Sequence, residues 1–252
     1  MESSLLFDVA SLMPSDQPLQ LSHLLLAALG TRLYTQHQDR TPRSGPVLIV
    51  SNHRSFLDAP LLMAALNRSI RFACHHYMGQ VPVMRDIVEK MGCFPLSLPE
   101  QRQQTFFDQA AQLLQAQQVV GLFPEGAEPM VKRTLPEQVG PFQRGFAHLA
   151  LRAPVPNLAV LPVAIASDQE AVNAAFPLRL LSLFDPSEPL FSQDGWHPMV
   201  IYQRVNVLIG RPYWIRPMHR EHYQGKQAKT LVTELTQQCH AEIRMLLQQG
   251  SY

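Results

Sequence analysis

The chain has 252 residues, 46% of them hydrophobic and 16% charged, which is enough apolar material for one large domain or two small ones. Its 21 basic and 20 acidic residues leave a net charge of +1, and this balance argues against a nucleic-acid partner bound through a broad basic surface. The three cysteines lie far apart without a CxxC pair, which excludes a disulfide framework and favours a reducing, cytoplasmic compartment.

The first predicted element is a helix over residues 19–34. Its apolar residues recur at spacings of three and four and form a stripe along one face: Leu21, Leu24, Leu25, Ala28, Leu29 and Leu33. Such a helix packs on the core or lies in a membrane interface, although it has few basic residues for anionic lipid. Because the first 31 residues contain no Lys or Arg and the apolar run is short, we expect neither a signal peptide nor a spanning helix.

Strand patterns then alternate with helical patterns. Short apolar runs rich in branched residues predict strands at 46–53, 119–126, 157–167 and 202–210. One-sided apolar patterns predict helices at 105–118 and 226–248. This order is typical of an α/β sandwich, with a largely parallel mixed sheet flanked by helices.

No repeat or long low-complexity linker divides the chain, so we expect one domain over residues 1–252. Within it we expect an amphipathic helical segment at 1–40, a catalytic α/β core at 41–215 and a C-terminal helix at 216–252.

Polar residues follow two of the predicted strands, in SNHRSFLD (51–58) and FPEG (123–126). Ligands bind beyond the carboxyl ends of parallel strands, so both segments should face one cleft. His53 and Asp58 would lie about 140° apart on a continuous helix, so the chain must bend between them. The bend lets Asp58 accept a hydrogen bond from one imidazole nitrogen, which leaves the other free to take a proton from a hydroxyl group.

A structural alternative exists for the same residues. Ser55 and Asp58 form a capping-box pattern, and Asp58 before Ala59 and Pro60 would make a good helix N-cap. The chain has no convincing GxSxG nucleophile elbow, so direct transfer is easier to support than a covalent enzyme intermediate.

Taken together, NHRSFLD, FPEG about seventy residues later, PFQRGFAHLA and LPVAIA resemble in this order the glycerolipid acyltransferase family. The resemblance runs from about residue 47 to residue 210. It implies an O-acyltransferase of phospholipid biosynthesis, which moves a fatty acyl chain from acyl-CoA or acyl carrier protein to the free hydroxyl of a lysophospholipid. Among lysophospholipids, the resemblance implies 1-acylglycerol-3-phosphate as the first acceptor to consider.

The resemblance also assigns roles to residues. It makes His53 the general base, Asp58 the residue that orients it, and Glu125 with Gly126 part of the acceptor site. Pro162 matches a later block that closes the same region. It implies no metal and no cofactor beyond the acyl donor as co-substrate. Since the acceptor is a lipid, we expect a cytoplasmic protein that attaches peripherally to the inner face of the membrane.

Two departures concern the acceptor's phosphate. The family usually has an Arg six residues after the glycine that corresponds to Gly92, whereas Leu98 stands there in this chain. The FPEG block usually continues with Thr-Arg-Ser, whereas this chain has Ala-Glu-Pro at 127–129.

Both missing arginines are usually assigned to the acceptor's phosphate. Either Arg102, Lys132 or Arg133 replaces them, or the acceptor is not a phosphate monoester. The three cations could equally be ordinary surface side chains.

Other residues give weaker signals. Cys74, His75 and His76 could suggest a metal, but adjacent side chains point in different directions, which favours a structural role. Four aromatic residues could line an acyl groove or fill the core, and we favour the core: Phe191, Trp196, Tyr213 and Trp214. Rival functions are a hydrolase or transacylase with the same His and Asp, or a lipid-binding protein without activity.

Overall fold

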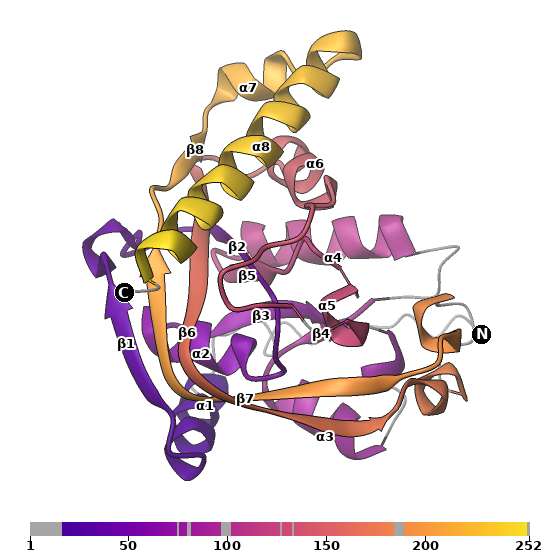
Figure 1. Cartoon of the computed structure of the whole chain (residues 1–252). Helices are drawn as coiled ribbons and strands as arrows, with labels where there is room; N and C mark the ends of the chain where they lie inside the picture. The colour runs from indigo at the N-terminus through magenta and orange to yellow at the C-terminus, as the bar shows by residue number, and fades with distance from the viewer. Residues whose placement is uncertain are drawn as a thin grey trace, which may run out of the picture.

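The computed structural model describes residues 17–74, 76–79, 82–96, 102–126, 128–132, 134–183 and 189–250. Within them one eight-stranded sheet has the order β1-β7-β6-β2-β5-β3-β4, with β8 paired to β6 (Figure 1). The strands are β1 (Arg32–Gln36), β2 (Val47–Ser51), β3 (Ile70–Cys74), β4 (Phe94–Pro95), β5 (Val119–Leu122), β6 (Leu158–Pro177), β7 (Trp196–Ile209) and β8 (Tyr213–Ile215).

Helices connect and cover these strands. The α-helices are α1 (Gln17–Ala28), α2 (Asp58–Leu66), α3 (Pro82–Lys90), α4 (Arg102–Gln115), α5 (Glu128–Val131), α6 (Gly145–Arg152), α7 (Pro217–Glu221) and α8 (Gly225–Gly250). Short 3-10 helices are η2 (Gln38–Arg40), η3 (His76–Gly79), η4 (Leu178–Leu183) and η5 (Pro189–Ser192). The predicted helices at 105–118 and 226–248 correspond to α4 and α8, with ends shifted by up to three residues.

The sheet is mixed and largely parallel, as predicted. β2 runs parallel to β5 and β6, β3 runs parallel to β4 and β5, and β1 runs parallel to β7. Only the pairs that β6 forms with β7 and β8 are antiparallel among the described strands.

Strand β2 is buried on both faces, which explains its unbroken apolar sequence. Leu48 and Val50 face one core, which also contains buried residues of α4, α6 and α8. Val47 and Ile49 face a second core, which contains buried residues of α1 and α2. The sheet is thus the middle layer of a sandwich, and β2 is shielded from solvent along its whole length.

The predicted helix over 19–34 is wrong beyond residue 28. Gly30 has a φ of 66°, a left-handed conformation that suits glycine, and the chain turns there into edge strand β1. The 1–40 segment, expected to be helical, therefore also contains a strand. The predicted stripe is only partly right: Leu21, Leu25 and Leu33 pack against the second core, whereas Leu24 is 67% and Leu29 37% exposed. The residues that α1 buries are Pro18, Ser22 and Leu26.

Strands β6 and β7 are longer than predicted. The sequence predicts a strand at 157–167, but β6 continues to Pro177, and it predicts a strand at 202–210, but β7 already begins at Trp196. Strand β2 accompanies β6 only as far as Val163, and β1 begins to pair with β7 at Arg204. Past these points β6 and β7 run on together as a two-stranded arm, residues 168–177 and 196–203, which Figure 1 shows bending away from the sheet. Two register shifts, between Ser167 and Glu170, lie at the bend, where bulges increase strand curvature.

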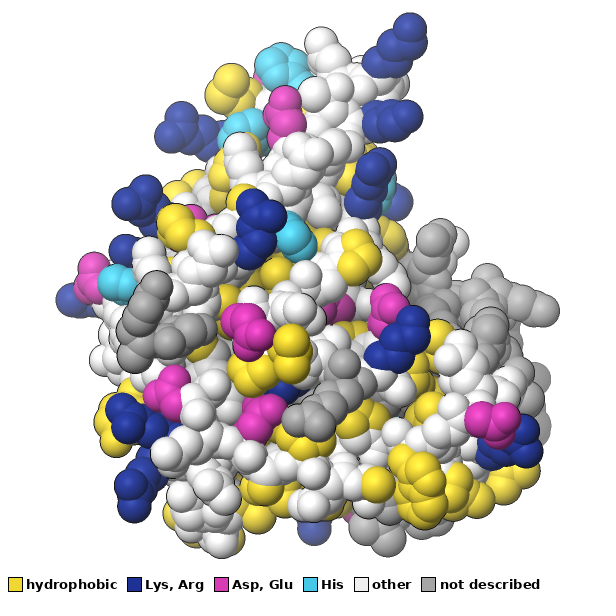
Figure 2. Space-filling view, viewed as in Figure 1, with side chains coloured by type: hydrophobic (Ala, Val, Ile, Leu, Met, Phe, Trp, Pro, Cys, Tyr) yellow, Lys and Arg dark blue, Asp and Glu magenta, His cyan; other side chains and the backbone are white. Residues whose placement is uncertain are grey.

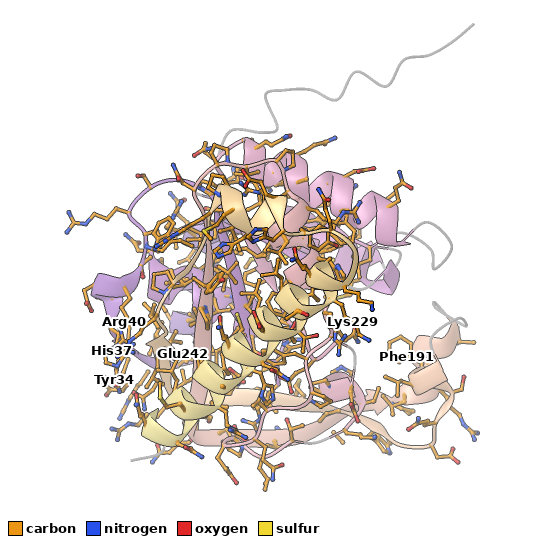
Figure 3. All side chains as sticks on the ribbon, turned by 90° about the horizontal axis from the view of Figure 1, so that it is seen from above. Tyr34, His37, Arg40, Phe191, Lys229 and Glu242 are labelled. Atoms are coloured by element: carbon orange, nitrogen blue, oxygen red, sulfur yellow. The ribbon has the colours of Figure 1, made fainter. Side chains whose placement is uncertain are left out.

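The tip of the arm lies far from β1, although the base of the arm adjoins it: the hydroxyl of Thr31 donates to the carbonyl oxygen of Tyr202 at 2.9 Å. Figure 3 shows Phe191 at the far end of the arm, and Tyr34 with Arg40 at the other side of the molecule. Arg40 links the segment after β1 to the end of β7, because its Nη1 donates to the carbonyl oxygen of Ile209 at 3.0 Å.

Candidate active site

Two parallel neighbours, β2 and β5, deliver the two polar segments to one edge of the sheet. Val50 of β2 pairs with Leu122 of β5, so the chain leaves both strands at the same level. The backbone N–H of His53 donates to Oε1 of Glu125 at 2.9 Å. The predicted meeting of the two segments is confirmed.

The loop after β2 folds around Asp58, the first residue of α2. Its side chain is fully buried, and its Oδ2 lies 2.8 Å from Nδ1 of His53. The same oxygen accepts the backbone N–H groups of Arg54 at 2.6 Å and Ser55 at 2.9 Å. Its other oxygen, Oδ1, accepts the hydroxyl of Tyr202 at 2.8 Å. A buried carboxylate needs such donors, because burying an unpaired charge is costly.

These contacts bear on both interpretations of Asp58. It is the first residue of α2, but its carboxylate turns back to N–H groups that precede the helix. The N-cap position belongs to Leu57, and no side chain caps the helix there. The predicted bend and the His53 contact are confirmed. Asp58 is not the N-cap, but the capping-box contacts are present, because Oδ2 of Asp58 accepts the N–H of Ser55 and Oγ of Ser55 accepts the N–H of Leu57 at 3.1 Å.

The imidazole of His53 is fixed from a second side. It stacks on Phe123 with 4.2 Å between ring centroids and 15° between planes, and Phe123 stacks in turn on Phe72 at 5.2 Å. The His53 side chain is 15% exposed. Within the described residues no hydrogen bond engages Nε2. With Nδ1–H donating to Asp58, Nε2 can act as the base.

Glu125 connects two loops. Its Oε1 accepts from the N–H of His53, and its Oε2 accepts from the N–H of Gly140 at 2.6 Å. Burial raises the pKa of Glu125, and the two N–H donors counteract only part of this effect. The carboxylate therefore joins the loop that carries His53 to the segment around Gly140. A role for Glu125 in acceptor binding stays a prediction.

Gly126 has a φ of 74°, which glycine adopts without strain. The space beside it is occupied, because a Cβ built there would lie 2.5 Å from Nε2 of Gln143. Gln143 thus fills the space beside Gly126 in this structure, and acceptor binding by Gly126 also stays a prediction.

The three candidate cations remain untested as phosphate ligands. Arg133 and the side chain of Arg102 lie outside the described residues, although Arg102 itself begins α4 rather than preceding it. Lys132 is exposed, and its Nζ lies 3.0 Å from Oε1 of Glu128.

Sequence reasoning missed a buried ion pair beside the dyad. Both Nη atoms of Arg54 donate to the carboxylate of Glu170 at 2.7 Å, and Nη2 also donates to the carbonyl of Thr134 at 2.8 Å. Burial lowers the pKa of Arg54, but the hydrogen bonds and charge of Glu170 outweigh it and raise the pKa overall. No pattern in the sequence points from residue 54 to residue 170, so only the fold reveals this contact.

The structure agrees with some of the weaker sequence predictions and contradicts others. Phe191 is buried and Tyr213 packs against the core, as expected, but the core assignment is wrong for Trp196 and Trp214, which are exposed. Cys74 is half-buried in β3, and burial raises its pKa to about 12. No group of three metal-ligating side chains occurs among the residues that the structure describes.

The acyltransferase family model matches residues 32–166, which is more than half of the chain. The chain belongs to the acyltransferase family. The matched range includes the His53–Asp58 dyad and the FPEG segment, whereas Tyr202 and Glu170 lie outside it.

Relatives of this acyltransferase-family chain include two chloroplastic 1-acyl-sn-glycerol-3-phosphate acyltransferases. Identity is 31% over 121 residues for the Brassica napus protein and 30% over 121 residues for that of Arabidopsis thaliana. The match covers 48% of this chain but only 33% and 32% of those proteins, so the chain spans about a third of their length.

The fold is also that of a solved structure, the 1-acyl-sn-glycerophosphate acyltransferase PlsC from Thermotoga maritima. The TM-score is 0.60 and the identity 14%, over 97% of this chain and 83% of that chain. At this identity the likeness establishes a shared fold alone.

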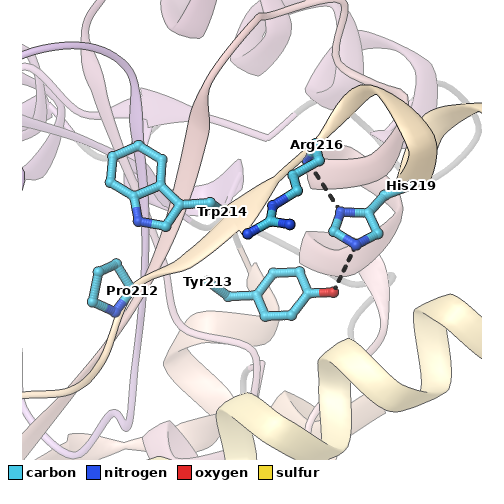
Figure 4. A pocket seen from close by; sticks show the side chains of 5 residues that line it. All are labelled: Pro212, Tyr213, Trp214, Arg216 and His219. Carbon is cyan, nitrogen blue, oxygen red and sulfur yellow. Dashed lines mark hydrogen bonds between the residues drawn. The ribbon is translucent and has the colours of Figure 1, made fainter.

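A separate hollow of about 320 Å³ lies at the opposite edge of the sheet, beside β8 (Figure 4). Its lining is Pro212, Tyr213, Trp214, Arg216 and His219. Strand β8 pairs with the beginning of β6, whereas the dyad follows the carboxyl end of β2. Figure 2 shows basic side chains gathered at this end of the molecule, around α7 and the start of α8. The His53–Asp58 dyad of this acyltransferase-family chain therefore lies away from the hollow.

We predict that Glu125→Gln destabilises the protein. The amide nitrogen of Gln cannot accept a hydrogen bond, so one of the two backbone donors would face another donor. The loss should be about 1.5–3 kcal/mol of the free energy of unfolding, measured by urea denaturation. Glu128→Gln is the matched control, because Glu128 is exposed and pairs only with Lys132 among the described contacts. Unchanged stability with a raised KM for the acceptor would instead identify Glu125 as a substrate ligand.

Proposed function

We propose that this acyltransferase-family protein transfers a fatty acyl chain from a thioester donor, acyl-CoA or acyl carrier protein, to the free hydroxyl of a lysophospholipid. The first acceptor to consider is 1-acylglycerol-3-phosphate, which the names of the plant relatives suggest. The observation that carries the proposal is the 2.8 Å contact between His53 Nδ1 and the buried carboxylate of Asp58.

The geometry suits direct transfer. Nδ1–H of His53 donates to Asp58, and Nε2 takes the proton of the acceptor hydroxyl as its oxygen bonds to the thioester carbonyl carbon. The tetrahedral intermediate collapses with cleavage of the C–S bond, and His53 returns the proton to the leaving sulfur. The products are an ester and a free thiol. Asp58 stabilises the imidazolium that forms between the two proton transfers.

We predict that His53→Ala and Asp58→Asn each lower turnover by roughly 10²- to 10⁴-fold while the fold survives. Release of free thiol from acyl-CoA, measured with and without lysophospholipid, checks this. His23→Ala, which changes an exposed histidine of α1, should leave turnover unchanged. Near-normal turnover in folded His53→Ala would contradict the general-base role. Thiol release that is independent of acceptor would favour a hydrolase, and a wild type without turnover would favour a lipid-binding protein.

The acceptor's phosphate requires a cation. A phosphate monoester carries close to two negative charges, and leaving them unpaired in a partly dry site would weaken binding strongly. We predict that Arg102→Ala or Arg133→Ala raises the KM for 1-acylglycerol-3-phosphate and leaves that for the acyl donor unchanged. Arg102 is at the first turn of α4, where the helix dipole also favours an anion. Lys132→Ala is the comparison. Faster turnover of an uncharged lysolipid would show that the acceptor is not a phosphate monoester.

The partner surface is a membrane, since the acceptor is a lipid. None of the helices in the described ranges has the length and hydropathy to cross a bilayer. Large apolar side chains are nevertheless exposed on segments beyond the carboxyl edge of the sheet: Phe56 (47%), Leu183 (75%) and Trp196 (57%). We propose that these side chains contact lipid during peripheral attachment to the inner membrane face.

Flotation with anionic liposomes tests this attachment. The double variant Leu183→Ala with Trp196→Ala should float less than the wild type, because it loses two apolar contacts with the bilayer. Trp214→Ala is the matched control, because Trp214 is exposed at the opposite edge of the sheet. Wild-type protein that stays wholly soluble with substrate lipid present would contradict peripheral attachment.

A further inference from the structure

Tyr202 of β7 contacts the dyad directly. Its hydroxyl donates to Oδ1 of Asp58 at 2.8 Å, and the residue is only 1% exposed. Burial first, and then the charge of Asp58, raise the pKa of Tyr202 well above its usual value, so the phenol remains a protonated donor. Among the contacts described, it is the only side-chain donor on the oxygen of Asp58 that does not face His53.

The position of Tyr202 depends on the arm. Glu170 and Tyr202 are directly paired across β6 and β7, just past the two register shifts. Directly opposite residues project to the same face of a sheet. Glu170 binds Arg54, which follows His53, while Tyr202 binds Asp58, so one cross-strand pair contacts both parts of the His53–Asp58 loop.

A second contact ties the same loop to β7. The hydroxyl of Ser55 donates to the carbonyl oxygen of Val200 at 2.6 Å, two residues before Tyr202. The backbone around Tyr202 is therefore fixed relative to Asp58, and the phenol cannot withdraw without disturbing a buried hydrogen bond.

We propose that Tyr202 is a positioning residue of the transfer reaction: by donating to Oδ1 it keeps the Asp58 carboxylate oriented and partly neutralised, so that Oδ2 serves His53. The kinetic consequence of this proposal rests on the proposed function, whereas the expected effect on the imidazole does not require substrate. Loss of the hydroxyl leaves more negative charge facing His53, which stabilises the protonated imidazolium. The base is then neutral only at higher pH.

The test compares Tyr202→Phe with Tyr213→Phe. Tyr202→Phe removes one oxygen and keeps the ring. Tyr213 is the control because it lies in β8, away from the dyad, where its hydroxyl forms a hydrogen bond with His219. Turnover of Tyr202→Phe should fall roughly 10- to 100-fold, the scale of losing a hydrogen bond to a charged group, with KM values nearly unchanged. The acid limb of the pH–rate profile should move up by about one unit. Tyr213→Phe should change none of these.

Two further variants separate positioning from simple packing. In an Asp58→Asn background Tyr202→Phe should cost less than about twofold in turnover, since the charged acceptor is gone. Replacing Tyr202 by 3,5-difluorotyrosine keeps the ring and the hydroxyl, so it should fold even if Tyr202→Phe does not. Because fluorination makes the phenol a stronger donor, it should move the acid limb to lower pH, opposite to Tyr202→Phe.

NMR titration of the His53 imidazole provides a readout without substrate. The imidazole should titrate at higher pH in Tyr202→Phe and at lower pH in the difluorotyrosine protein. If the wild type transfers no acyl group, the proposed function fails while this titration still tests Tyr202. A folded Tyr202→Phe with wild-type titration and turnover, or equal losses in the wild-type and Asp58→Asn backgrounds, would overturn the inference.

Discussion

A single buried charge, the carboxylate of Asp58, organises the region around it. A carboxylate without solvent is tolerated only when its lone pairs accept hydrogen bonds. Within the described part of the chain Asp58 has four donors: two backbone N–H groups, the imidazole of His53 and the phenol of Tyr202. Because these donors come from the loop after β2 and from β7, the need to satisfy one charge joins two distant parts of the chain.

The sheet makes this arrangement possible. Parallel strands end at one edge, so β2 and β5 bring His53 and Glu125 together although 72 residues separate them. Strand β6 runs parallel to β2 but does not end at that edge, and with β7 it continues as the arm that supplies Glu170 and Tyr202. The loop between β2 and α2 is therefore supported from the sheet and from the arm.

The same hydrogen-bond network limits which cations are available to bind a phosphate of the acceptor. Arg54 is next to His53 in sequence, but both its Nη atoms are engaged by Glu170 and it is only 4% exposed. Releasing it for a phosphate would break two hydrogen bonds to a partly buried carboxylate, which is unfavourable. For this reason the proposed phosphate ligands are other cations, those after FPEG and at the start of α4.

The sequence by itself determined the mixed parallel sheet, the loop position of both motifs and the bend that joins His53 to Asp58, because each follows from local periodicity and short spacing. Only the tertiary structure decided that residues 32–36 form a strand, that Glu125 braces a loop, and that Tyr202 and Glu170 contact the motif. Those contacts span 116 and 144 residues, and they depend on β6 and β7 continuing together as the arm beyond the strands that flank them. Local periodicity cannot show such contacts, because it does not determine which distant strands pair or how far a pair continues past its neighbours.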